Sequence, residues 1–225
     1  MRVSIVVFAC VVALSSSRNA SAEQILFSSL QPNGGFSTTI ATAFGTFEHQ
    51  TDPALNGSRA FPFVSADTAL LSKLELAVQF PWFTEPWWPS AGVLEVNLFA
   101  SDGGLPGALL ESFTSPGPHA LGTLSTFESV LRPQLMAGAL YFLEARAVGF
   151  ANGLWFLRSG DTFPNQPDFR RTGDGPWQVG SRIFDDTAFR VSGEPLAAAT
   201  PEPASVVLLG TGMALAAWRR RRHER

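Results

Sequence analysis

Several residue types are scarce in this chain. Among its 225 residues there is one cysteine and one tyrosine, and charged residues make up 16%, against about 25% in ordinary soluble domains. The lone cysteine, Cys10, has no partner for an internal disulfide and cannot form a thiolate cluster for a metal. Glycine (20) and proline (16) are frequent, yet hydrophobic residues reach 45%, which excludes a disordered chain, a collagen-like repeat and a coiled coil. The length predicts one domain with short appendages.

Basic residues are few and unevenly placed. Residues 23–200 contain nine of them against 17 acidic residues, a net charge of −8. Nucleic-acid binding depends on clustered Lys and Arg, so we expect no nucleic-acid partner. The one basic run directly follows an apolar segment, which favours a membrane-flanking role over a nucleic-acid patch; it consists of Arg219, Arg220, Arg221 and Arg222.

The N-terminal residues 1–22 have the pattern of a secretory signal peptide. Arg2 supplies the positive charge, residues 3–14 are apolar, and Ala20 and Ala22 form an A-x-A cleavage site. The mature chain is then expected to begin near Glu23 and to contain no cysteine. The alternative is a buried N-terminal strand.

The C-terminal residues have a second pattern with three parts. Residues 194–203 form an Ala/Pro linker, residues 204–218 carry no charge, and the arginine run opens a basic tail at 219–225. Fifteen helical residues span about 22 Å, somewhat short of a bilayer core of about 30 Å, but arginine side chains extend the match by reaching the interface. We predict a short transmembrane helix with the tail in the cytoplasm and the body outside.

These C-terminal residues resemble a known family. Pro201-Glu202-Pro203, the apolar segment and the arginine cluster are similar to the PEP-CTERM sorting signal. The resemblance implies recognition by exosortase, a membrane-embedded processing enzyme, in a Gram-negative bacterium that makes exopolysaccharide. It also implies export to the cell surface or extracellular matrix. It covers roughly 25 residues and does not describe the body.

The body, residues 23–193, is predicted to be all-β: a single antiparallel β-sandwich of jelly-roll type. Apolar and polar residues alternate over 74–80, 94–98 and 141–147, although Phe142 falls on the polar side. Weaker strands are expected near 25–30, 38–47, 59–65, 108–113, 123–131, 153–158 and 183–192. Glycine- and proline-rich turns such as 102–104 and 173–176 separate them. The stretch 94–110, LEVNLFASDGGLPGALL, with Trp177 and residues 188–193, resembles choice-of-anchor extracellular β domains, for which no activity is implied.

No catalytic motif is present in the body, so we predict that the protein is not an enzyme. The sequence has no H-E-x-x-H, G-x-S-x-G or phosphate-binding glycine loop, and His49 is expected to be a solvated loop residue. A secreted hydrolase, the weaker alternative, would need two facing carboxylates. The acids considered are Glu75, Glu95, Glu111 and Glu144, and strand alternation places the first, second and fourth on solvent-facing sides.

We predict no cofactor. Calcium is the only metal for which the sequence offers candidate ligands. The acids that crowd one loop-rich stretch are Asp161, Asp168, Asp174, Asp185 and Asp186. Calcium prefers such oxygen ligands, but their spacing matches no recognised calcium loop. The alternative is surface ion pairing with neighbouring arginines, namely Arg158, Arg170, Arg171, Arg182 and Arg190.

The most unusual local segment is FPWFTEPWWP at residues 80–89. Its three prolines prevent a regular strand, so Trp82, Trp87 and Trp88 would be held on a loop. This loop is expected to cap the core, and the alternative is stacking of the rings on sugars. Trp155 and Trp177 are expected in the core.

The sequence as a whole predicts an exported, surface- or matrix-associated protein with a structural or adhesive role. Exosortase, the membrane and exopolysaccharide are its expected partners. The alternative function is a carbohydrate-binding module for exopolysaccharide.

Overall fold

The computed structural model describes residues 22–45, 57–81, 92–115, 117–149, 151–158, 166–184 and 187–196. Apart from the last residue, these belong to one compact unit that ends at Pro195. In these ranges the regular elements are all strands, and no helix is long and apolar enough to cross a membrane. The predicted signal peptide up to Ser21, the predicted transmembrane helix and the arginine run lie outside the described residues.

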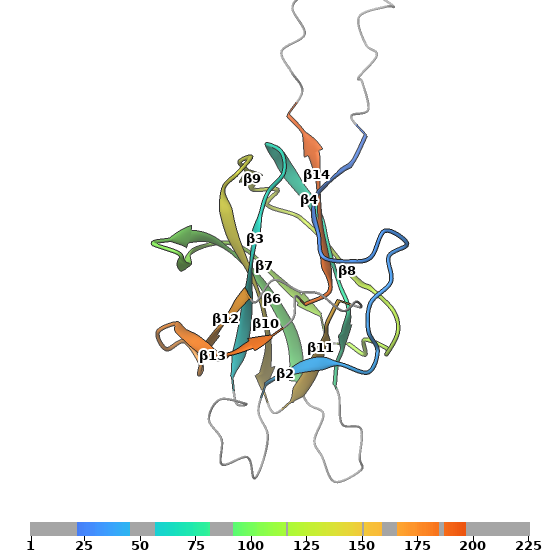
Figure 1. Ribbon diagram of the computed structural model, residues 1–225, viewed down its shortest axis with the longest axis vertical. Helices are drawn as coiled ribbons and strands as arrows, with labels where there is room; N and C mark the ends of the chain where they lie inside the picture. The colour runs from blue at the N-terminus through green and yellow to red at the C-terminus, as the bar shows by residue number, and fades with distance from the viewer. Residues whose placement is uncertain are drawn as a thin grey trace, which may run out of the picture. The chain divides into compact units, whose positions relative to one another are not determined.

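The described residues form three antiparallel sheets (Figure 1). The five-stranded sheet has the order β1-β14-β4-β8, with β9 also paired to β4; the six-stranded sheet has the order β13-β12-β3-β10-β6-β7; the third has the order β2-β11-β5. The strands are β1 (Gln24–Ser28), β2 (Ala41–Gly45), β3 (Ser58–Val64), β4 (Ala69–Leu76), β5 (Val78–Gln79), β6 (Gly92–Asp102), β7 (Leu105–Ser115), β8 (Ser125–Glu128), β9 (Gln134–Leu135), β10 (Leu140–Gly149), β11 (Asn152–Phe156), β12 (Gln166–Arg171), β13 (Gln178–Phe184) and β14 (Phe189–Pro195). The all-β, antiparallel prediction is confirmed, whereas the jelly-roll connection order stays a prediction.

One apolar core is shared by all three sheets. Leu74 comes from the five-stranded sheet, Leu98 and Leu143 from the six-stranded sheet, and Trp155 from the third, and all four are fully buried. Trp155 packs edge-on against Phe61, with ring centroids 5.2 Å apart. Because no disulfide can staple the described body, this shared core is its main source of stability.

Local sequence explains the longest hairpin. Strands β6 and β7 meet at the turn Asp102-Gly103-Gly104, and both glycines have positive φ values of 58° and 85°. Such a two-residue turn needs left-handed backbone at both centres, which glycine adopts without a steric cost. The predicted turn at 102–104 is therefore confirmed.

Two strands of the six-stranded sheet were not anticipated by the pattern. Strand β12 has the sequence QPDFRR, and residues 183–192, expected as one strand, include the end of β13 and the start of β14. The turn predicted at 173–176 does join β12 to β13, and the Gly175 amide donates to the Thr172 carbonyl at 3.1 Å. Strand β12 lacks a period-2 apolar pattern because Phe169 is its only large apolar residue, and charged residues flank it on both sides.

The hairpin of β12 and β13 changes the environment of the sheet's second face. Phe142 is fully buried and packs against Phe169 of β12 with a centroid distance of 5.0 Å. Trp177, which precedes β13, is half-buried and meets Phe99 of β6 at 5.9 Å. The expectation that Phe142 shares a solvated face was therefore wrong, because aromatic side chains from the hairpin cover this part of the sheet.

Candidate functional site

A buried charge network lies on the second face of the six-stranded sheet. Glu144 of β10 has no exposed surface, although alternation predicted it on a solvent-facing side. Arg171 of β12 donates two hydrogen bonds of 2.8 Å to its carboxylate, and the Asn97 amide donates a third at 2.9 Å. The Arg171 guanidinium also lies 4.5 Å from the Trp177 ring centroid and 5.5 Å from that of Phe99. Paired charges and aromatic faces together compensate the loss of water.

The network continues toward the end of β10 through Arg146. Its Nε lies 2.8 Å from Glu95, which also accepts a 2.6 Å hydrogen bond from Asn97. A guanidinium N–H of Arg146 donates to Asp174 at 2.8 Å. This hydrogen bond and the positive charge of Arg146 hold the pKa of Asp174 below its usual value. Arg146 therefore links a half-buried carboxylate, Glu95, to an exposed one, Asp174.

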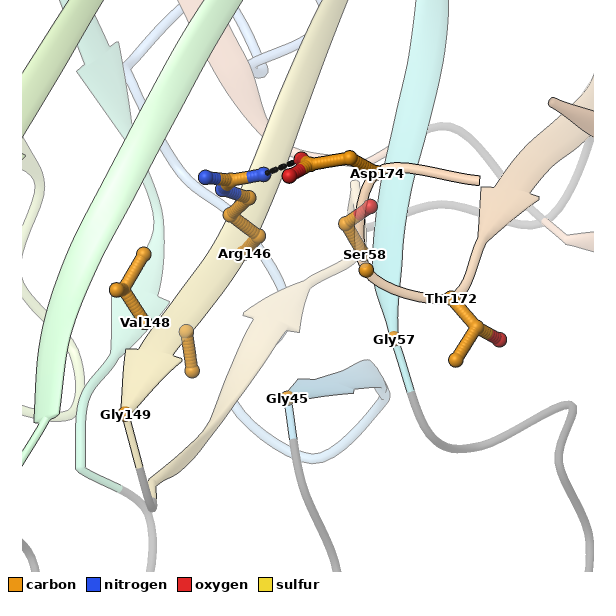
Figure 2. A pocket seen from close by; sticks show the side chains of 10 residues that line it. Gly45, Gly57, Ser58, Arg146, Val148, Gly149, Thr172 and Asp174 are labelled. Carbon is orange, nitrogen blue, oxygen red and sulfur yellow. Dashed lines mark hydrogen bonds and ion pairs between the residues drawn. The ribbon is translucent and has the colours of Figure 1, made fainter. Parts of the chain in front are cut away.

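Arg146 and Asp174 line a pocket of about 480 Å³ at this end of the sheet (Figure 2). Its wall combines the end of β2, the start of β3, the last residues of β10 and the turn after β12. Gly45 and Gly57 pair through two backbone hydrogen bonds of 2.8 and 2.9 Å. A Cβ on Gly45 would lie 2.5 Å from the Ala151 carbonyl oxygen, so a larger residue does not fit at position 45 without a shift of the backbone.

Ser58 lines this pocket but keeps its hydroxyl buried. The residue is 5% exposed, and its Oγ has almost no accessible surface and no hydrogen-bond partner within the described part of the chain. Figure 2 shows it close to the Gly57 backbone and below Asp174. A buried hydroxyl without a partner is unfavourable, because it has lost water and gained nothing in return. The hydroxyl is therefore an unsatisfied group within the pocket wall, whereas the accessible charged pair is that of Arg146 and Asp174.

The remaining predicted acids each have partners of their own. Glu75 of β4 lies 3.3 Å from Arg190 of β14 and is half-buried. Glu111 of β7 is buried, and it accepts hydrogen bonds from the Ser129 hydroxyl and from the amides of Val130 and Leu131 at 2.5–3.0 Å. The four acids thus do not gather into one cleft; only Glu95 and Glu144 come together, and arginines face both.

Two of the five aspartates considered for calcium lie in described residues. Asp168 is fully buried between Arg59 at 2.6 Å and Arg170 at 2.5 Å, and Asp174 pairs with Arg146. Both aspartates pair with arginines, as the alternative to calcium binding predicted, although the ion pairs of Asp168 are buried and not at the surface. The described ranges hold no group of three metal-ligating side chains. Asp161, Asp185 and Asp186 fall outside them.

Several predicted residues cannot be placed. Trp82, Trp87 and Trp88, the sorting tripeptide and the arginine run are all outside the described residues, as are His49 and Ala20. Ala22 is the first described residue and is exposed. Asn97 and Ser58 belong to the site but were not anticipated, whereas Arg171 was expected only as a partner of nearby aspartates. The signal for Asn97 in the sequence is its polar side chain on a strand side that was expected to meet solvent; Ser58 and Arg171 lie outside the expected strands.

The comparisons with known proteins concern the C-terminal segment. Residues 199–222 match the PEP-CTERM protein-sorting motif. The matched residues contain Pro201-Glu202-Pro203 and the arginine run, so the predicted sorting signal is confirmed. No curated protein shows significant similarity to the chain. The likeness of the body to choice-of-anchor domains stays a prediction.

The PEP-CTERM motif indicates an exported protein that exosortase sorts at the membrane of a Gram-negative bacterium. The motif and the charge network of the body belong to separate parts of the chain, since the compact unit ends at Pro195. The motif accounts for sorting, and its residues do not include those of the pocket or the charge network.

Proposed function

We propose that this protein is a structural or adhesive component of the exopolysaccharide matrix. Its all-β body is delivered there by the signal peptide and the PEP-CTERM segment. In this proposal the body is an antiparallel β-sandwich without catalytic activity or cofactor, and exosortase acts on the C-terminal tail. The observation that carries the proposal is the match of residues 199–222 to the PEP-CTERM motif.

The body has properties that suit this role. The described part is a disulfide-independent β structure whose main apolar core is shared by its three sheets. Its acidic side chains are engaged mainly by arginines, as in Glu144 with Arg171 and Asp168 with Arg59. Such pairing supports a rigid structural domain better than a hydrolase, which needs a carboxyl group free to donate or accept a proton.

The sorting step is tested by replacing Pro201, Glu202 and Pro203 together with alanine. We expect export to continue but C-terminal processing to stop, so that the variant stays in the membrane fraction with a higher mass than the wild type. Mass spectrometry of the protein from fractionated cells measures this difference.

The end of β14 offers a matched control, although the sequence assigns it to the linker. Glu194 and Pro195 form a second Glu-Pro pair, eight residues upstream of Glu202-Pro203, and their replacement with alanine should leave processing unchanged. Identical masses for the tripeptide variant and the wild type would contradict sorting by exosortase. Recovery of the processed wild type in the culture medium, without association with exopolysaccharide, would contradict the matrix role.

The alternative function is a carbohydrate-binding module. The sequence suggests this function through Trp82, Trp87 and Trp88, which lie outside the described residues. Replacing Trp87 and Trp88 with alanine separates the two roles of that segment. A loss of stability indicates capping of the core, whereas a loss of exopolysaccharide binding with an unchanged melting temperature indicates a sugar platform.

A further inference from the structure

The longest edge strand in the described part of the chain is β7. It closes one side of the six-stranded sheet, and β6 is its only partner among the described residues. It has 11 residues, whereas β13 at the opposite edge of the sheet has seven, one of them Arg182. The edge strands of the other two sheets are shorter still. The outer side of such a strand presents backbone N–H and C=O groups to which another strand can pair.

Proteins commonly protect such an edge with lysine, proline or a β-bulge. In β7 these features lie near its turn, where Pro106 is located and where the register with β6 shifts at Phe99 and Ser101. From Glu111 to Ser115 the pairing with β6 is regular, and the one lysine of the chain, Lys73, belongs to β4. Residues 111–115, the open edge, therefore carry no lysine, proline or bulge.

The open edge forms one wall of a groove of about 600 Å³. The other wall is β8, the edge strand of the five-stranded sheet in the described residues. Phe113 of β7 and Phe127 of β8 meet between the walls, with ring centroids 6.2 Å apart. The groove therefore marks the side of the body at which two sheets end together.

An apolar tip stands beside this groove. Val130 and Leu131 follow β8 and are 85% and 70% exposed, the highest values among the large apolar side chains of the described residues. Their amides donate to the buried carboxylate of Glu111, so the tip is fixed to the open edge. Two adjacent apolar side chains are thus held in water, and burial by a partner would be favourable.

Charge and symmetry favour a second copy of the chain as that partner. Residues 23–200 carry a net charge of −8, so two copies repel each other across most of their surface. The only charged residue of the open edge is Glu111, and three donors already occupy its carboxylate. Across the groove, Glu128 is the register partner of Lys73. Two copies can meet here without bringing unpaired acids together, whereas a basic partner would find no unpaired acid on the open edge.

We propose that two copies of this chain associate through their open edges, with β7 of one copy antiparallel to β7 of the other. An antiparallel strand pair has a two-fold axis, so one edge is complementary to itself. The six-stranded sheets become continuous, and the tips with Val130 and Leu131 are covered between the copies. The proposal rests on the proposed function in one respect: it names the partner through which a structural matrix component assembles.

Cysteine crosslinking tests the contact. In a Cys10→Ser background, which leaves the full chain without cysteine, Ser112→Cys and Thr114→Cys are purified in mild detergent and oxidised separately and as an equimolar mixture. A two-fold axis at Ser112 or Thr114 brings two copies of one variant together, whereas an axis at Phe113 brings the two variants together in the mixture. These three axes keep most of the open edge paired.

The matched control is Gln178→Cys, an exposed position on β13 at the opposite edge of the same sheet. We expect one of the three samples to form a disulfide-linked dimer about tenfold faster than Gln178→Cys, because the contact raises the effective concentration of the two thiols. Non-reducing electrophoresis over a time course measures the rates.

Val130→Asp tests the tip in the same assay. The added carboxylate would be placed beside its own copy in the dimer, so crosslinking should slow about tenfold. The control is Val179→Asp on β13, which is 61% exposed and should leave the rate unchanged. Both substitutions are at exposed positions, so the melting temperature should stay the same.

The proposal is overturned if none of the three samples crosslinks faster than Gln178→Cys, or if Val130→Asp and Val179→Asp crosslink at the same rate. A preference of this edge for a strand from a different protein would give the first of these results. The assay uses the purified chain and does not depend on export or on C-terminal processing. Its failure therefore leaves exosortase sorting untouched, and a failure of sorting leaves the dimer measurable.

Discussion

The two faces of β10 are built from alternating residues of one strand, yet both are buried by different means. On the inner face, Leu143 and Ala145 have no exposed surface and pack in the apolar core shared by the sheets. On the outer face, Phe142 and Glu144 are equally buried. There the cover comes from side chains of β12, which lies beyond β3 in the same sheet, and from Trp177 before β13. Glu144 is compensated by Arg171 rather than by water.

The difference shows what an alternating pattern establishes. It identifies the residues that share a face, because successive side chains of a strand point to opposite sides. It does not reveal whether a distant hairpin covers the second face. A polar residue on a strand is therefore ambiguous: it either meets solvent or is buried with a partner, and the partner decides its energetic role.

The largest expected effect comes from removing the charge on the outer face. Glu144→Leu leaves the Arg171 guanidinium beside Trp177 without its carboxylate, and we expect a loss of about 3–5 kcal/mol in the free energy of unfolding. Urea denaturation followed by tryptophan fluorescence measures the change.

The control for this variant removes both charges. Glu144→Leu combined with Arg171→Met should recover most of the lost stability, because an apolar pair of similar volume replaces a buried ion pair at little cost. A solvated outer face would instead give a small change for Glu144→Leu and no recovery in the double variant.

The inner face provides the apolar counterpart. Leu143→Ala removes three buried carbons from the core, and we expect a loss of about 3 kcal/mol. Replacing Arg171 should not restore the stability lost in Leu143→Ala, whereas it should restore most of the stability lost in Glu144→Leu. Guanidinium and urea melts of both variants make the comparison, and a change below about 1 kcal/mol for Leu143→Ala would contradict tight packing of the inner face.

The fold was predictable where local chemistry determines it. The Asp102-Gly103-Gly104 turn and the alternation around Leu74 and Leu98 suffice to predict an antiparallel β body. Strand β12 was not predictable, because Asp168 and Arg170 look like loop residues until Arg59 is placed beside Asp168. Arg59 and Asp168 are 109 residues apart in the sequence, and no local pattern reports such a pairing.

The candidate site divides in the same way. The sorting motif was predictable because its three parts are contiguous in the sequence. The pocket was not, since Ser58, Arg146 and Asp174 come from three separated segments. Their convergence depends on the register in which β10 pairs with β3 and on the turn after β12.

His119 gives the comparison a pH-dependent test. Burial lowers the pKa of this ring, which stacks on Phe127 at 5.8 Å and whose Nδ1 lies 2.6 Å from the Ser125 hydroxyl. The unfolded chain then binds the proton more tightly than the folded one. The folded state is fully stable above the unfolded pKa of about 6.5 and loses stability as the pH falls below it toward the folded pKa.

The measurement for His119 is the unfolding free energy of wild type and His119→Gln between pH 7.5 and about 5. We expect the wild type to lose more stability than the variant over that interval. Equal losses would mean that the ring is as well solvated in the folded chain as in the unfolded one.

The smallest effect is expected where the same kind of ion pair lies at the surface. The Lys73 ammonium is 3.0 Å from the Glu23 carboxylate, but the two side chains are 27% and 40% exposed. Both charges keep much of their hydration, so Lys73→Gln should change the free energy of unfolding by at most about 0.5 kcal/mol, and 1 M salt should remove even that difference. Differential denaturation at low and high salt measures it. Lys73→Gln and Glu144→Leu each remove one charge from a pair at similar distance, so burial of the pair is the main difference between them. A loss at Lys73 as large as that at Glu144 would show that pairing itself, and not the covering hairpin, sets the energetic role of charges in this body.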